Sequence, residues 1–222
     1  MENEKLPITE RILTEASKWV SAIFQPLFIP LMAFMALFLF TYLQIMPQPY
    51  KLFVLGLVCC FTILLPITTA YLYVRINGAV ASSAERPGRR VMPYLLGILS
   101  FIFCAIIMYR LRIPWYMNGI ILASILIMIV FLLANIKWRV SIHAGGAGAV
   151  IGGIISFAAL FGYNPVWLLC VFILIAGMVG SARIILGKHT LNEVLSGFTI
   201  GLVCAVMVLH PTSNTLFRHL LF

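Results

Sequence analysis

The chain contains 222 residues, of which 63% are hydrophobic and 9% charged, and its formal net charge is +9. This composition excludes an ordinary soluble domain. Apolar runs of about 20 residues, each long enough to cross the hydrocarbon core of a bilayer, recur along the chain. We therefore expect an all-α, polytopic membrane helix bundle surrounded by membrane lipids.

The excess of basic over acidic residues bears on the choice of partner. The sequence has 15 Lys and Arg residues against 6 Asp and Glu residues. The basic residues are spread over short loops between the apolar runs, which argues against nucleic acid as a partner. Anionic head groups or phosphate suit this distribution better. The sequence does not indicate an oligomeric state.

The first predicted element is an N-terminal polar segment, residues 1–18, which mixes acidic and basic side chains. The apolar run after it has no clear small-residue cleavage site, so we expect no cleaved signal peptide. Residues 7–24 are expected to form an amphipathic helix that lies at the membrane interface before the first span.

Seven apolar runs predict transmembrane helices, with six possible. They lie at residues 20–44, 51–74, 91–109, 115–136, 146–162, 165–186 and 193–210. The sequence GYNP at 162–165 is a tight turn, so the fifth and sixth spans are expected to form a helical hairpin. We predict one membrane domain over residues 19–210, followed by a short tail at 211–222.

The path through seven spans predicts which loops share a membrane face. It places the N-terminus and segments 75–90, 137–143 and 183–192 together, with most of the basic residues. The positive-inside rule would place that face in the cytoplasm. Arginines used in chemistry would raise the count on either face, so the side of a site stays open. We expect a multi-pass protein of the cell (inner) membrane.

Two glycine pairs predict a helix contact. GAVIG at 148–152 and GFTIG at 197–201 are GxxxG patterns in the fifth and seventh spans. Such pairs let two helix backbones approach closely. The contact would bring residues 143 and 189 to neighbouring positions at one membrane face.

The cysteines and acids argue against a bound metal. All five cysteines fall in apolar runs without a CxxC pair, which favours buried thiols over a disulfide framework or zinc site. The sequence has no Asp, and after Glu15 its only carboxylates are Glu85 and Glu193. Magnesium and calcium need clustered oxygen ligands. We therefore expect no metal and no other cofactor.

Three polar clusters lie on the predicted shared face. They are ERPGRR at 85–90, RVSIHAGG at 139–146 and ARIILGKHTLNE at 182–193. Guanidinium groups match phosphate oxygens bidentately, and imidazoles act as nucleophiles or general acids. Glu193 follows His189 by four residues, on one helix face, so its carboxylate can orient that imidazole. These clusters predict phosphoryl chemistry without a metal.

The clusters also resemble the type 2 phosphatidic acid phosphatase superfamily, which includes lipid phosphatases and vanadium haloperoxidases. The family motifs are KxxxxxxRP, PSGH and SRxxxxxHxxxD. Arg86 and Pro87 match the end of the first motif. Ser141-Ile142-His143 is similar to the second, and the third is matched by an arginine, a histidine and an acid at the family spacing: Arg183, His189 and Glu193.

The resemblance implies a role for each matched residue. His189 would be the nucleophile that becomes phosphohistidine, and Glu193 would orient it. His143 would be the general acid, and then the base that activates water. The phosphate would be held by the remaining matched or neighbouring groups: Arg86, Arg183, Ser141 and the backbone amides near Ala144 and Gly145.

The sequence departs from the family pattern at several positions. Ala79 stands where the family has its lysine, so Arg89, Arg90 or Lys188 would have to replace that contact. Other replacements are Val140 and Ile142 in the second motif, and Ala182 and Glu193 in the third. Seven predicted spans exceed the usual six of the family.

Each cluster also has a structural interpretation. Thr190 to Glu193 fits a capping box, and a carboxylate held at the Thr190 amide would have less freedom to orient an imidazole. Ser141 is placed to cap the fifth span, and His143 alone resembles a solvated loop histidine. A head-group-binding turn would be formed by Arg86, Arg89 and Arg90. A membrane-interface anchor would be formed by Lys137, Trp138 and Arg139.

The agreement of order, spacing and sidedness favours an enzyme. We predict a metal-independent membrane phosphatase that hydrolyses a lipid phosphate or lipid pyrophosphate through a phosphohistidine. A lipid phosphotransferase would have the same site residues. The alternative from another class is a lipid-binding or transport protein that kept the fold and lost the chemistry.

Overall fold

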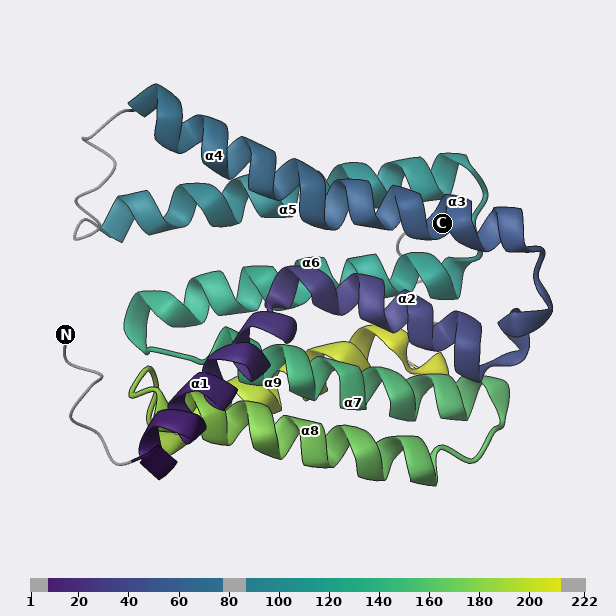
Figure 1. Ribbon diagram of the computed structural model, residues 1–222. Helices are drawn as coiled ribbons and strands as arrows, with labels where there is room; N and C mark the ends of the chain where they lie inside the picture. Colours follow the sequence, from purple (N-terminus) through teal and green to yellow (C-terminus); the bar gives the residue numbers. More distant parts are fainter. Residues whose placement is uncertain (1–7, 78–86, 213–222) are drawn as a thin grey trace. The chain divides into compact units, whose positions relative to one another are not determined.

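The computed structural model describes residues 8–77 and 87–212, and the secondary structure in these ranges is helical, with no strand. The α-helices are α1 (Ile8–Ile23), α2 (Ile29–Phe40), α3 (Gln48–Cys59), α4 (Leu65–Asn77), α5 (Pro87–Arg110), α6 (Trp115–Lys137), α7 (Ile142–Phe161), α8 (Val166–Ile185) and α9 (Leu191–Leu209). Two 3₁₀ segments, η1 (Pro26–Phe28) and η2 (Tyr42–Ile45), and a π-helical segment, η3 (Cys60–Leu64), join the first four. The predicted all-α class is confirmed (Figure 1).

The described helices do not reach the seven predicted spans, whereas the six that the sequence left possible is their upper limit. Five helices in the described part of the chain are long and apolar enough to cross a membrane, or six if one bent pair forms a single span. The five are Gln48–Tyr73, Trp115–Asn135, Ile142–Phe161, Val166–Ile185 and Leu191–Leu209. These helices confirm a polytopic membrane protein.

Two of the predicted spans fail for local reasons. The predicted first span is interrupted where Gln25 is extended before Pro26, and the helices on either side are bent by 42°. The residue before a proline avoids the helical region, which explains the break. The predicted third span is the apolar part of α5, Tyr94–Arg110, which falls in the class of shorter helices.

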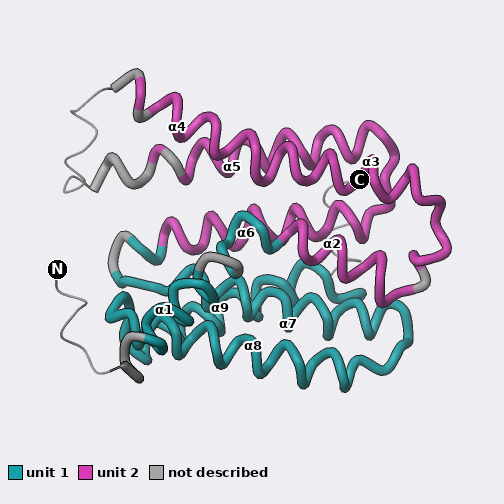
Figure 2. The backbone as a smooth tube through the Cα atoms, viewed as in Figure 1, with its two compact units in different colours: residues 1–29, 134–222 teal, residues 30–133 magenta. Residues whose placement is uncertain are grey.

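The chain divides into two compact units, coloured separately in Figure 2. Unit 1 comprises Met1–Ile29 and Ala134–Phe222, and unit 2 comprises Pro30–Leu133. The single membrane domain predicted over 19–210 and its flanking segments stay predictions, because two compact units can belong to one domain.

Unit 1 is centred on the contact between α7 and α9 that the glycine pairs predict. A Cβ atom on Gly201 would overlap the carbonyl of Gly145, and one on Gly197 would overlap the backbone of Ser141. A Cβ on Gly152 would lie 2.6 Å from the Leu202 carbonyl oxygen. The helix backbones therefore approach within the space that a methyl group would need, which confirms the predicted contact.

Helix α8 packs beside this pair, and α7 and α8 form the predicted hairpin. Helix α7 ends at Gly162, which takes the left-handed conformation at φ 66° and allows the chain to reverse. Glycine is favoured there because a side chain would clash with the backbone. Helix α8 returns toward the end of unit 1 at which α7 begins (Figure 1).

Helix α1 packs against α8 and completes unit 1. Its buried face carries small hydroxyl residues, Ser17 and Ser21, whereas Ile12 and Trp19 are exposed, Trp19 to 70%. Exposed apolar side chains on a membrane protein are suited to lipid. The predicted amphipathic helix is present, and its position at the membrane interface stays a prediction.

Unit 2 holds most of the remaining spans. Helices α3 and α4 continue through η3, and α5 packs along α4 and η3. The Ser100 hydroxyl on α5 donates to the Phe61 carbonyl in η3, where a π-helical turn frees backbone groups.

The cysteines are free thiols, and two of them, Cys60 and Cys170, are exposed rather than buried as predicted. The exposed face of a membrane span is apolar, as the protein interior is, so a thiol is also suited to that face.

Candidate functional site

The candidate site lies at the end of unit 1 where α7 begins, α8 ends and α9 begins. Figure 1 shows these three helix ends together, with α1 crossing them. Two of the three predicted polar clusters, 139–146 and 182–193, meet here. Side chains that are separated by about 40 residues in sequence therefore meet at one end of unit 1, because α7 begins there, α8 ends there and α9 begins there.

A tight turn after α8 positions His189. The Arg183 carbonyl accepts hydrogen bonds from the amides of Lys188 at 3.1 Å and His189 at 3.4 Å. Gly187 within this turn has φ 61°, a left-handed conformation that glycine adopts without strain. The main-chain carbonyl of Arg183 thus holds His189 in place. The guanidinium of Arg183 is predicted to bind the phosphate that His189 attacks.

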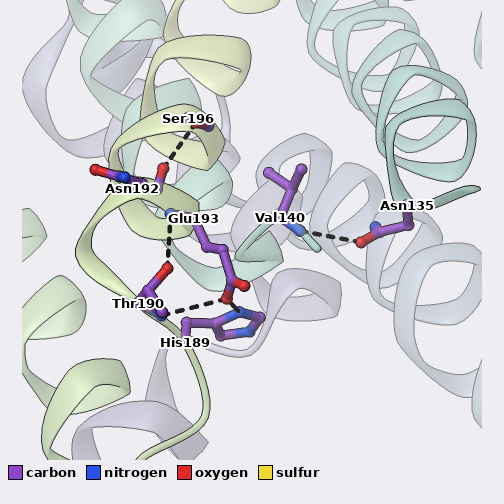
Figure 3. A network of polar contacts seen from close by, with 7 residues as sticks. All are labelled: Asn135, Val140, His189, Thr190, Asn192, Glu193 and Ser196. Carbon is purple, nitrogen blue, oxygen red and sulfur yellow. Dashed lines mark hydrogen bonds and ion pairs between the residues drawn. The ribbon is translucent and has the colours of Figure 1, made fainter. Parts of the chain in front are cut away.

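His189 pairs with Glu193 as predicted. Figure 3 shows the His189 ring against the Glu193 carboxylate, with Nδ1 at 2.9 Å from Oε2. A carboxylate accepts hydrogen bonds, so Nδ1 is the nitrogen that carries the proton in this pair. The neutral ring then has its free lone pair at Nε2. This is the arrangement that a nucleophilic imidazole requires.

Glu193 also caps α9, as the rival interpretation proposes. Its Oε2 accepts from the Thr190 amide at 3.2 Å, and the Thr190 hydroxyl accepts from the Glu193 amide at 3.5 Å. The expectation that capping would limit orientation is wrong, because the same carboxylate oxygen contacts both partners (Figure 3). The cap fixes the carboxylate that orients the ring.

Ser141 joins the start of α7 to the first turn of α9. Its amide donates to the Glu193 carbonyl at 3.1 Å. It occupies the N-cap position, but its side chain makes no capping bond, so the predicted capping role is wrong. The Ser141 side chain is 0% exposed, and its Oγ has no partner in the described part of the chain. The backbone of Ser141 packs closely against Gly197 of α9.

Gly145 does not offer its amide to a ligand. The amide donates to the Ser141 carbonyl at 3.0 Å as the first hydrogen bond of α7. The amides ahead of it in the first turn are those that a helix start leaves without an intrahelical acceptor. Gly145 instead allows Gly201 of α9 to approach its carbonyl.

His143, in the first turn of α7, is half-buried and contacts α1. Its ring lies close to the backbone of Ser21 and within electrostatic range of Arg183 and His189. A neutral imidazole carries a proton on one ring nitrogen only, which leaves the other nitrogen to accept. His143 and His189 thus occur together at the end of unit 1, as the glycine pairs predict.

Arg183 has a buried donor without an acceptor. The residue is half-buried in the last turn of α8, and its Nε has no partner among the described residues. Lys188 is exposed five residues later. Arg139 is also exposed and acts electrostatically on Glu193. The end of unit 1 therefore combines positive charge with unpaired donors.

The first predicted cluster contributes nothing described to this site. Glu85 and Arg86 lie outside the described residues, and Arg89 lies in the first turn of α5, in unit 2. Arg86 and Arg89 stay predicted phosphate ligands. Within residues 8–77 and 87–212, no group of three or more His, Cys, Asp or Glu residues is placed to hold a metal ion.

The contribution of α1 was not predicted. The Ser21 backbone lies close to the His143 ring, and the Ser21 hydroxyl is buried without a partner in the described residues. The signal in the sequence is the spacing of Ser17 and Ser21, which places two hydroxyls on one helix face. An interpretation as an interfacial amphipathic helix overlooks them, because it assigns the apolar face to the membrane and the polar face to water.

The comparisons with known proteins agree with the position of the site. Residues 134–215 match the model of the PAP2 superfamily, and this range contains α7, α8, α9 and every predicted site residue of the second and third clusters. No curated protein and no solved structure is significantly similar to the chain. A PAP2 domain suggests a phosphatase-like function. The resemblance predicted from the motifs is thus confirmed over residues 134–215, where the chain is similar to the PAP2 superfamily.

Proposed function

We propose that this protein is an integral membrane phosphatase that hydrolyses a lipid phosphate or lipid pyrophosphate through a phosphohistidine at His189, without a metal. The observation that carries the proposal is a pair of buried, unpaired groups, Ser141 Oγ and Arg183 Nε, at the end of unit 1 that holds the His189–Glu193 pair.

Unpaired buried donors favour a bound anion. A buried polar group without a partner costs about 1–3 kcal/mol, and more when it is charged. A phosphate oxygen would satisfy the Ser141 hydroxyl and the Arg183 guanidinium, which binds phosphate in a forked geometry. These groups would also stabilise the negative charge that develops on the equatorial oxygens during phosphoryl transfer.

The first step uses both histidines. Nε2 of His189 attacks phosphorus, the bond between phosphorus and the leaving oxygen breaks, and protonated His143 donates its proton to that oxygen. Glu193 accepts from Nδ1 and stabilises the positive charge that forms on the His189 ring. The products of this step are the dephosphorylated lipid, or its monophosphate, and a phosphohistidine.

The second step regenerates the enzyme. Neutral His143 accepts a proton from water while the water oxygen attacks phosphorus, and the bond between phosphorus and His189 Nε2 breaks. Inorganic phosphate leaves. The Ser21 backbone lies close to the His143 ring and would favour one ring orientation in both steps.

Lipid substrates fit a site at the end of membrane spans. The helices that carry it, α7, α8 and α9, are all candidate spans. Acyl or prenyl chains could remain among the spans while the head group binds at the helix ends. We propose the cell (inner) membrane as the location.

The test is a phosphate-release assay with purified protein over a panel of phosphatidic acid, lysophosphatidic acid and prenyl diphosphates. We expect the wild type to release phosphate in the presence of EDTA and His189→Ala to lose about 10⁴-fold or more of that activity. His210→Ala, at the opposite end of α9, is the matched control. Full activity of His189→Ala would refute the phosphohistidine mechanism.

A carrier without catalysis is the second candidate, because Ala79 occupies the lysine position of the first family motif. Orthovanadate distinguishes the two, since it expands its coordination as the phosphoryl transition state does. Tight binding that depends on both His143 and His189 supports the enzyme, and lipid binding without vanadate binding supports the carrier. Transfer of the phosphoryl group to a second lipid, instead of water, would appear in product analysis.

A further inference from the structure

Helix α1 brings a third unpaired group to the end of unit 1. The buried side-chain atoms without a partner in the described residues are Ser21 Oγ, Asn118 Oδ1, Ser141 Oγ and Arg183 Nε. Three of these four belong to unit 1, and Asn118 belongs to unit 2. Two of the three are the predicted phosphate ligands Ser141 and Arg183. The third, Ser21, is not part of any motif that the sequence predicts.

The position of Ser21 is tied to the site by two contacts. Its backbone lies close to the ring of His143, the predicted acid and base. Helix α1 also packs against α8, whose last turn carries Arg183. Ser21 is only 9% exposed, so its hydroxyl is not simply hydrated at the surface.

Ser21 differs from other hydroxyls on the helices of this protein. Most donate to the carbonyl four residues earlier, a common way to satisfy a hydroxyl inside a membrane helix. Examples are Thr41, Thr62, Ser124, Ser156, Ser196 and Thr199. Ser21 makes no such bond, which leaves its hydroxyl free to donate to a ligand.

We propose that the Ser21 hydroxyl is a further ligand of the substrate phosphate, so that α1 completes a site otherwise built by α7, α8 and α9. The proposal rests on the proposed function. A phosphoryl group between Ser141 and Arg183 would be adjacent to His143 as well, and the residue whose backbone lies close to the His143 ring is then placed to donate to one of its oxygens. Phosphate accepts several donors at once, and a hydroxyl adds no charge to desolvate.

The test compares Ser21→Ala with Ser17→Ala in the full chain. Ala favours a helix and keeps the backbone that lies close to His143, so Ser21→Ala removes the hydroxyl alone. Ser17 is the matched control, because it is buried on the same face of α1 one turn earlier, at 6% exposure. Orthovanadate is the probe, measured by inhibition and by direct titration, together with KM and kcat for phosphatidic acid.

We expect Ser21→Ala to bind vanadate about tenfold to a hundredfold more weakly, as the loss of a hydrogen bond to a charged group predicts. Ser17→Ala should match the wild type, and Ser21→Thr should restore most of the affinity. Unchanged vanadate binding in Ser21→Ala, or an equal loss in Ser17→Ala, would overturn the inference and leave the proposed function intact. A wild type that neither releases phosphate nor binds vanadate would overturn both.

Discussion

Units 1 and 2 treat their buried polar side chains differently. In unit 2, the hydroxyls of Thr41, Thr62 and Ser100 all donate to backbone carbonyls, and Asn118 is the exception. In unit 1, the buried Ser156 hydroxyl also donates to a backbone carbonyl, but the buried groups of Ser21, Ser141 and Arg183 have no partner in the described residues. Satisfied hydroxyls stabilise a membrane scaffold, whereas unpaired ones cost free energy unless a ligand uses them. By this comparison, unit 2 mainly supports the fold, whereas unit 1 has buried polar groups left for a ligand to bind.

The largest effect that would sharpen this comparison is expected from Glu193→Gln. Glutamine can still accept from the Thr190 amide and so keep the cap, but it carries no charge to stabilise the His189 ring when that ring becomes positive. We expect kcat to fall by about 10²- to 10⁴-fold with a nearly unchanged melting temperature. Near wild-type activity would mean that Glu193 is only a helix cap.

A second large effect concerns the close approach of α7 and α9. Gly201→Ala would force a methyl group against the Gly145 carbonyl and should destabilise unit 1 by about 2–3 kcal/mol or more. Thermal unfolding in detergent measures the change. Gly177→Ala on α8 is the matched control, because a Cβ there meets nothing within 4 Å. Equal melting temperatures for the two variants would contradict the packing described for α7 and α9.

Arg183→Lys tests the unpaired donor with the charge retained. A lysine lacks the planar fork and the Nε donor, so we expect kcat/KM for a lipid phosphate to fall by about tenfold to a hundredfold. Inhibition by vanadate should weaken in parallel. Arg110→Lys, at the end of α5 in unit 2, is the control and should behave as the wild type.

The smallest effect is expected in unit 2. Ser100→Ala removes the hydroxyl that donates to the Phe61 carbonyl in η3 and should cost about 1 kcal/mol of stability. Phosphate release should not change, because this hydroxyl serves the scaffold. A specific loss of activity at unchanged stability would break the division of roles between the units.

Much of the site is predictable because it is local. His189 and Glu193 are four residues apart on one helical turn, and Thr190 to Glu193 is a capping box, so the sequence alone predicts both contacts. The α7–α9 contact is equally predictable, because only glycines permit such a close approach. The membrane class follows from the apolar runs, whose length is matched to a bilayer.

The number of spans is less predictable, because apolar composition does not show where a helix breaks. Gln25 and Pro26 interrupt one predicted span, and the apolar part of α5 is short. Hydropathy averages over both features. The roles of Arg86 and Arg89 remain predictions.

By itself, the sequence determined the membrane class, the helix pairing and the order of the histidines, because these depend on composition and short spacings. Only the tertiary structure decided that Ser141 leaves its hydroxyl unpaired, that the Gly145 amide is used inside α7, and that Ser21 of α1 lies close to His143. The proximity of Ser21 to His143 joins residues more than 100 positions apart at one helix end, and no local pattern encodes that contact.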